Sequence, residues 1–299
     1  MRARHATGAA RLARMRLPDD LRLRTAGEHD LRAIATLRES VGWTAHEWAL
    51  RAVLDPTDSR CLLVVDGDHA VGVGSGISYG RLGFVGNMVV AEGHRRRGIG
   101  AAILESVIEF LEDERGCERL ELFATESGRP LYASYGFALT DPSAMASVPR
   151  STALGVDPTI EVEEARAADG LAAYDAPRFG GDRRRLLALM AADPGRPLLV
   201  ARDKGAIRGY AWLRSDGPRL GPVLADTPGV AAALLAAAFE RLPGAPELTL
   251  NVPTANVPGT RWLASVGIEL EPWDGRMARG PAIPRRDDTI YANLVGALG

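Results

Sequence analysis

The feature that most constrains this chain of 299 residues is an order of elements that occurs twice. The first copy has a strand, a turn and a strand, then a strand, an amphipathic helix and a strand, at 62–73, 84–90, 98–115 and 119–124. The second copy repeats that order at 198–210, 221–225, 230–242 and 247–252. Both copies end in a related segment, Leu131–Phe137 or Trp262–Ile268, with Ala-Ser and Gly at the same spacing. The repeat predicts two copies of one mixed α/β domain.

A segment rich in proline and serine, Thr140–Pro158, separates the two copies and places a boundary near residue 155. We therefore expect a first domain at 21–150 and a second at 157–299. Residues 1–16 carry five arginines and no acid and superficially resemble an organelle presequence, but a disordered tail, or a true start at Met15, fits them better. We expect residues 1–20 to form a flexible tail.

Composition is that of a soluble globular protein, with 46% hydrophobic and 25% charged residues. A net charge of −2 provides no basic field for nucleic acid or an anionic membrane, so we expect neither as a partner. No apolar run approaches the roughly 20 residues of a membrane span. The two cysteines, Cys61 and Cys117, lack metal-site spacing and predict buried free thiols in a reducing cytoplasm. His46-Glu47 begins a zinc motif, but Leu50 replaces its second histidine, so no metal is expected.

The segment Gly86–Ala101 runs from a strand through a glycine-containing turn directly into a helix. Free N–H groups and the positive dipole end of such a helix bind anions, and glycines let a pyrophosphate approach the main chain. The pattern is neither a P-loop nor a dinucleotide-binding turn, since Ile103 stands where the third glycine would be. A different phosphate ligand is predicted.

These residues resemble the cofactor motif of the GNAT superfamily of N-acetyltransferases, (Arg/Gln)-x-x-Gly-x-(Gly/Ala), at Arg95, Gly98 and Gly100. A strand follows at 120–125, and Leu131–Phe137 resembles the superfamily's second signature, Leu-Tyr-x-x-x-Gly-Phe. The resemblance covers about residues 21–150 and extends to a tandem subgroup with a degenerate second domain. It implies an α/β fold of two GNAT-like domains, each a mixed, mostly antiparallel sheet flanked by helices.

The resemblance also implies an activity, the transfer of an acetyl group from acetyl-CoA to a primary amine of a small molecule or peptide. An amine attacks the thioester directly, and an acid protonates the departing thiolate. The acid would be Tyr132, whose alternative role is that of a core tyrosine. The base stays open between Glu126, Glu92, His46, Glu47 and an ordered water. The implied cofactor-binding residues are Met88, Val89, Val90, Arg95, Arg96, Arg97, Gly98, Ile99, Gly100 and Ala101.

The second copy lacks both signatures. Its turn reads Ala225–Gly229 with Asp226 in place of a cation, and Leu263 stands where the first copy has Tyr132. We expect a degenerate domain that packs against the first and contributes a wall of the substrate cleft.

Three alternatives remain at the level of sequence. They are a non-catalytic acyl-CoA sensor, a biosynthetic enzyme resembling mycothiol synthase, and a protein N-terminal acetyltransferase. The acceptor amine, the acyl chain and the oligomeric state stay open.

Overall fold

The computed structural model describes residues 17–299 except 166–167, 169, 194, 215–216 and 295. Of the predicted N-terminal tail, residues 1–16 therefore lie outside the described residues. The first half contains the strands β1 Leu21–Thr25, β2 Ser59–Asp66, β3 His69–Ser78, β4 Leu82–Val90, β5 Arg119–Ala124 and β6 Ala138–Pro149. Its helices are α1 Leu31–Glu39, α2 Glu47–Leu54, α3 Ile99–Glu109 and α4 Arg129–Ser134. A π-helical turn, Phe110–Glu114, extends α3.

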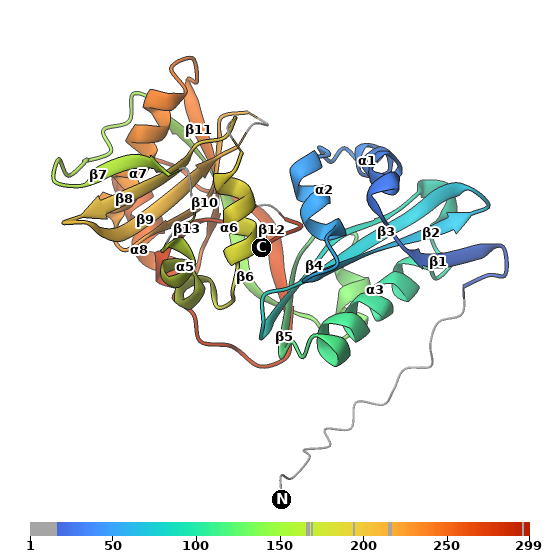
Figure 1. Ribbon diagram of the computed structural model, residues 1–299. Coiled ribbons are helices and arrows are strands. Elements are labelled where there is room, and N and C mark those ends of the chain that lie inside the picture. The colour runs from blue at the N-terminus through green and yellow to red at the C-terminus, as the bar shows by residue number, and fades with distance from the viewer. Residues whose placement is uncertain (1–16, 166–167, 169, 194, 215–216, 295) are drawn as a thin grey trace, which may run out of the picture.

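The second half repeats this order. Its strands are β7 Glu161–Ala165, β8 Leu198–Asp203, β9 Ala206–Leu213, β10 Arg219–Ala225, β11 Glu247–Pro253, β12 Glu271–Arg279 and β13 Ile290–Ala292. Its helices are α5 Leu171–Phe179, α6 Arg184–Ala191, α7 Pro228–Arg241 and α8 Val257–Ser265. The predicted fold class, two mixed and mostly antiparallel α/β units, is confirmed (Figure 1).

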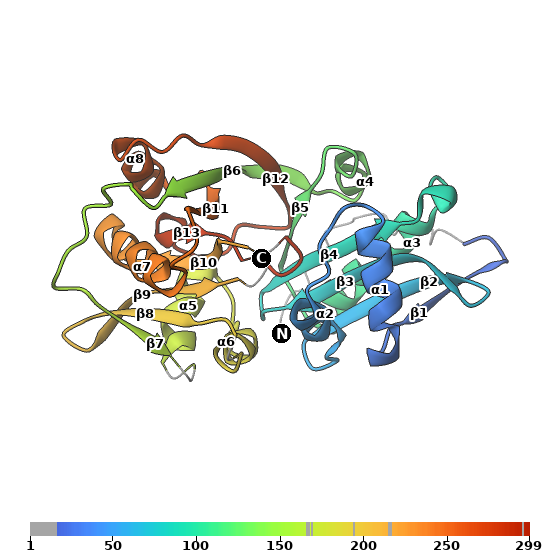
Figure 2. The ribbon, with the colours of Figure 1, turned by 90° about the horizontal axis from the view of Figure 1, so that it is seen from above.

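The two halves share one sheet rather than forming two separate ones. Among the described residues the strand order is β1-β2-β3-β4-β5-β12-β6-β11-β10-β9-β8-β7, with β13 beside β10. β12 of the second half lies between β5 and β6, and β6 of the first half pairs with β11. Each half therefore lends a strand to the other, and these strands occupy the middle of the molecule in both ribbon views (Figures 1 and 2).

This exchange changes the interpretation of the expected separator, Thr140–Pro158. Its first part is not a linker, because β6 occupies Ala138–Pro149. Pro142 lies opposite Gly275 at an irregularity of the β6–β12 ladder, and Pro149 is the last residue of β6. Proline is tolerated at bulges and strand ends, where no ladder hydrogen bond needs its missing N–H. The connection to β7 begins only after Pro149.

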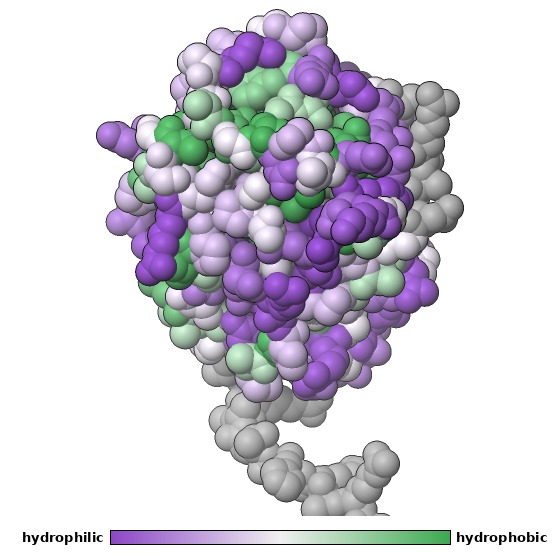
Figure 3. Space-filling model, turned by 90° about the vertical axis from the view of Figure 1, so that its left-hand side faces the viewer, coloured by the Kyte–Doolittle hydropathy of each residue, from purple (hydrophilic) through white to green (hydrophobic). Residues whose placement is uncertain are grey.

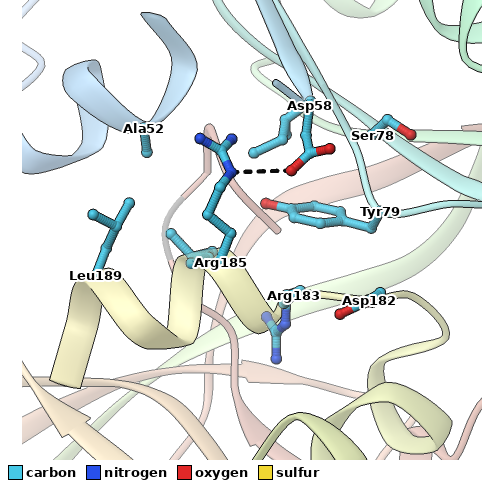
Figure 4. A pocket seen from close by; sticks show the side chains of 10 residues that line it. Ala52, Asp58, Ser78, Tyr79, Asp182, Arg183, Arg185 and Leu189 are labelled. Atoms are coloured by element: carbon cyan, nitrogen blue, oxygen red, sulfur yellow. Dashed lines mark hydrogen bonds and ion pairs between the residues drawn. The ribbon is translucent and has the colours of Figure 1, made fainter. Parts of the chain in front are cut away.

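An apolar core joins the two halves. One cluster of buried side chains includes Ile34 and Val53 from the first half with Leu187 and Tyr210 from the second. Trp48 packs edge-on against Trp212, with ring centroids 4.6 Å apart. At the edge of this core, Arg185 of α6 forms ion pairs with Asp55 and Asp58 of the first half. Figure 4 shows the pair with Asp58. The halves form one packed unit.

The opposite face of the first half's sheet is covered by α3, whose Ile103, Leu104 and Val107 are fully buried. In the second half α7 occupies the corresponding place, with Leu234 and Leu235 buried. The outer side of the second half carries hydrophilic residues over much of its surface and a band of hydrophobic ones across its upper part (Figure 3). No helix of the described residues is both long and apolar enough to cross a bilayer.

Candidate active site

The turn between β4 and α3 is open to an anion. Gly98 precedes the helix with φ +80°, a conformation that favours glycine, and it provides no capping side chain. In the described part of the chain, the backbone N–H groups of residues 96–101 donate to no main-chain acceptor. Arg95 and Arg96 are exposed beside the turn, and Arg97 is held by Asp20 at 2.6 Å. The structure thus presents bare amides at the start of a rigid helix.

The strands β4 and β5 diverge next to this turn. Their parallel register joins residues 82–84 to residues 119–121, and in the described residues it does not continue beyond them. Asn87 has φ +56°, and the β3–β4 register shifts here, which marks a bulge in β4. The edge of β4 from Val85 to Met88 therefore faces β5 across a gap, where main-chain groups can bind an extended ligand.

The predicted strand residues take different positions in this gap. Met88 lines a cavity, whereas Val89 is buried in the core. The carbonyl of Val90 accepts a hydrogen bond of 3.2 Å from Nε of Arg95, which ties the strand to the turn.

A cavity of about 480 Å³ opens beside the gap, between the two halves. Its described wall from the first half includes Arg38, Trp43, His46, Asn87, Met88 and Tyr132. Its described wall from the second half includes Arg214, Arg219, Asn251, Trp273, Asn293 and Ala297. Ala297 lies directly over Gly86, where a Cβ atom would be 2.6 Å from the carbonyl oxygen of Ala297. Both halves of the chain therefore line the cavity.

Tyr132 lies at the first-half side of the cavity, on α4. Its side chain is almost fully buried and packs edge-on against Phe137, and its hydroxyl has no hydrogen-bond partner among the described residues. Burial raises the pKa of Tyr132 to about 12, so the hydroxyl retains its proton at neutral pH. A protonated phenol at a cavity wall can act as a general acid.

The four side chains considered for the base are separated by the structure. His46 lines the cavity, and its Nε2 lies 3.3 Å from a guanidinium nitrogen of Arg214. Glu47 instead forms an ion pair with Arg51 on the surface of α2. Glu92 and Glu126 are exposed, and neither is among the described lining residues.

The second half has the same pair of diverging strands, but its gap is filled. The register of β10 and β11 joins Arg219–Leu220 to Thr249–Leu250, and β13 pairs with β10 immediately afterwards, at Val223 and Leu224. On its other side, the N–H of Asn293 donates to the carbonyl of Asn251 on β11 at 2.8 Å. The C-terminal strand thus satisfies the main-chain groups that stay open in the first half.

The turn of the second half is closed as well. Thr227 caps α7, because its hydroxyl accepts the N–H of Val230, and Pro228 has no N–H to offer. Asp226 places a carboxylate beside this turn, where Arg178 binds it at 2.6 Å.

Two lining residues that the sequence analysis did not select are prominent in the structure. Asn87 was a detectable signal, because asparagine is rare within strands and tolerates positive φ. Arg38 carried no signal, since a chain with 36 lysines and arginines does not distinguish one of them. Asn251 and Asn293 come from the second half and reach the cavity only through the fold. Trp43 lines the cavity, and both Trp43 and Trp48 are half-buried against the apolar core.

Comparison with known proteins agrees with this architecture. Residues 28–137 match the profile of the Acetyltransferase (GNAT) family, and residues 171–292 match that of an Acetyltransferase (GNAT) domain. No curated protein matches the chain in sequence.

Solved structures resemble almost the whole chain. An acetyltransferase structure from Pyrococcus horikoshii superposes with a TM-score of 0.78 at 24% identity, over 96% of this chain and 99% of its own. A GCN5-related N-acetyltransferase from Sphaerobacter thermophilus superposes with a TM-score of 0.62 at 18% identity, over 91% of this chain and 99% of its own. A tandem GNAT protein from the clavulanic acid biosynthesis pathway superposes with a TM-score of 0.59 at 15% identity, over 88% of this chain and 99% of its own. At these identities the likeness concerns the fold.

Proposed function

Because this chain belongs to the GNAT superfamily and carries two of its domains in tandem, we propose that it is an acetyl-CoA-dependent N-acetyltransferase whose first half binds the cofactor. The observation that carries the proposal is the continuity of three features. β4 connects them: residues 85–88 of this strand line the cavity beside Tyr132, β4 no longer pairs with β5 after Phe84, and the chain then leads through the turn to the bare amides at the start of α3. In the second half the equivalent gap holds β13.

The residues present fit CoA. The N–H groups of residues 96–101 and the guanidinium groups of Arg95 and Arg96 suit its diphosphate. The open edge of β4 near Met88 suits the amide-bearing pantetheine arm, which can hydrogen-bond to a strand as another strand does. Acetyl-CoA supplies the activated acetyl group.

The chain's own residues would orient the reaction and handle its protons. Tyr132 holds a proton at Oη and delivers it to the leaving sulfur. His46, the candidate base that lines the cavity, accepts a proton from the acceptor amine directly or through water. Residues of the second half form part of the cavity wall and would shield a bound acceptor from part of the bulk water, which strengthens polar contacts there.

The test is release of free thiol from acetyl-CoA in the presence of panels of amines, which include amino acids, peptides, polyamines and aminoglycosides. We expect turnover with at least one class and none without an amine. Tight binding of acetyl-CoA without turnover for any amine would instead favour the non-catalytic sensor.

A further inference from the structure

Arg38 is a cation inside the cavity wall whose partners in the structure are neutral. One terminal nitrogen donates to Oδ1 of Asn87, and the other donates to the carbonyl of Thr44 at 2.9 Å. Its Nε is buried and has no hydrogen-bond partner in the described residues. The guanidinium carbon lies 5.5 Å from the ring centroid of Trp43. The side chain is therefore fixed in position, but none of these contacts neutralises its charge.

A guanidinium in this position is costly without a counter-ion. Burial lowers the pKa of Arg38, which means that its surroundings disfavour the charged form. Arg38 is half-buried, and arginines that are fully buried have carboxylate partners, as Arg183 does at Asp175 and Arg276 does at Glu121. The described residues that line the cavity include no aspartate or glutamate. An anion on a ligand would remove this deficit.

We propose that Arg38 binds a carboxylate of the acceptor, so that the acceptor is a small amine of the amino-acid type. This inference rests on the proposed acetyltransferase function. A carboxylate is favoured over other anions because the planar guanidinium fork matches its two oxygens, and each group carries a single charge.

The position of Arg38 limits how far the carboxylate can be from the amine. Arg38 contacts Asn87, and Asn87 directly precedes Met88 on the strand edge assigned to the cofactor arm. The anion would therefore lie beside the strand edge assigned to the cofactor arm, which suits an acceptor whose carboxylate and amine are close together, as they are in a free amino acid. The volume of about 480 Å³ suits a small molecule.

The apolar part of the wall indicates the rest of the acceptor. Trp43 and Phe123 of the first half and Trp273 of the second half line the cavity. These rings suit an apolar or aromatic side group, which can stack on them. The acceptor class is thus an amino acid with a free carboxylate and an apolar side chain.

The test compares acceptors that differ only in the anion. Phenylalanine, leucine and their carboxamides are assayed by thiol release with the wild-type chain and with Arg38→Gln. We expect the wild type to prefer each acid over its amide by about 10- to 100-fold in kcat/KM, the range for a charge-assisted hydrogen bond. Arg38→Gln removes this preference, and Arg38→Lys restores part of it. Arg32→Gln, an exposed change on the same helix, leaves it intact.

Several outcomes would overturn the inference. If Arg38→Gln lowers kcat/KM equally for acids and amides, the role of Arg38 is to hold Asn87 and Thr44 in place instead. Preference for O-phosphoethanolamine over the amino acids would contradict the carboxylate. If no acceptor turns over, calorimetry with CoA present decides, and failure of the acids to bind overturns the proposal. Failure of CoA itself to bind is a separate result, which would refute the proposed function.

Discussion

The two halves of the molecule contain the same pair of diverging parallel strands, but the gap between those strands is open in one half and filled in the other. In the first half β4 and β5 separate after Phe84, and the described residues supply no strand to the gap. In the second half β13 lies in the equivalent gap and pairs with β10. A slot suited to an extended ligand in one half is completed by the protein's own main chain in the other.

The helix termini differ in the same sense. α3 begins at Gly98 with free amides, whereas α7 begins with a Thr227 cap and with Pro228. A domain of this fold can therefore lack the open ligand-binding gap and still keep its fold. The second half keeps the architecture, supports the first through β12, and forms part of the cavity wall.

The largest effect is expected from separating the halves. A fragment of residues 17–155 lacks β12, the strand between β5 and β6, and exposes the core that Trp48 shares with Trp212. We expect it to aggregate or to lack a cooperative thermal transition, while the whole chain unfolds cooperatively. A monomeric fragment with a sharp transition, followed by circular dichroism, would mean that the halves are independent.

Tyr132→Phe tests whether the open half performs chemistry. Removing the hydroxyl leaves the buried ring in place, so we expect CoA affinity to be unchanged and turnover to fall about 10²- to 10⁴-fold. Since burial raises its pKa to about 12, the wild-type rate should not decline through Tyr132 ionisation below about pH 11.

The matched control is Tyr135→Phe on the same signature, whose hydroxyl donates to Glu105 at 2.8 Å. We expect Tyr135→Phe to retain most of the turnover. Equal activity of Tyr132→Phe and wild type in a thiol-release assay would remove Tyr132 as the acid.

Glu121→Gln tests the connection between the halves. Glu121 is buried on β5, where it forms ion pairs with Arg276 of β12 and with Arg285. Burial alone would raise its pKa, but Arg276, Arg285 and Arg119 together outweigh burial and the pKa is lowered. Removing the charge leaves the buried guanidinium groups of Arg276 and Arg119 without a carboxylate, and we expect a loss of about 3–5 kcal/mol in the free energy of unfolding.

The same residue predicts a dependence on pH. Because the folded-state pKa is lowered, the stabilisation is present above the ordinary carboxyl pKa and is lost as pH falls through the lowered value. Denaturant unfolding between pH 3 and 7 should show a weaker acid dependence in Glu121→Gln than in wild type. Glu118→Gln, which removes an exposed pair with Arg81, should change little. Equal behaviour of both variants would contradict the role of Glu121.

Much of the fold could be predicted from the sequence, because local patterns determine it. Alternation and glycine turns indicated the hairpins, and the apolar spacing after Gly98 indicated α3. The strand exchange could not be predicted, since the pairing of β12 with β5 depends on contacts between residues about 150 positions apart. Pro142 and Pro149 made residues 140–149 resemble a linker instead of the strand β6, because a proline argues against a strand unless a bulge or a strand end accommodates it.

The candidate site divides in the same way. The turn of residues 95–101 and Tyr132 were predictable because their spacing along the chain is itself the pattern. Arg38, Asn251 and Asn293 were not, since three separate elements bring them to one cavity. The sequence also could not show that β13 fills the gap beside β10, because a three-residue strand has no sequence signature.

A smaller effect, on CoA affinity, is expected from a change in the open turn between β4 and α3. Arg96→Glu places a carboxylate beside the open turn, as Asp226 does in the second half, and Arg96 is exposed, so stability should hardly change. We expect CoA affinity to fall at least about tenfold through charge repulsion at the diphosphate. Arg261→Glu, an exposed change on α8, is the matched control and should leave affinity intact. Unchanged CoA affinity in Arg96→Glu would mean that the guanidinium of Arg96 does not bind the diphosphate.

The most direct test of the contrast between the halves is the stoichiometry of CoA binding, measured by isothermal titration calorimetry on the whole chain. With one open gap and one filled by β13, the account predicts one equivalent of CoA per chain. Two equivalents, or no binding at all, would contradict it.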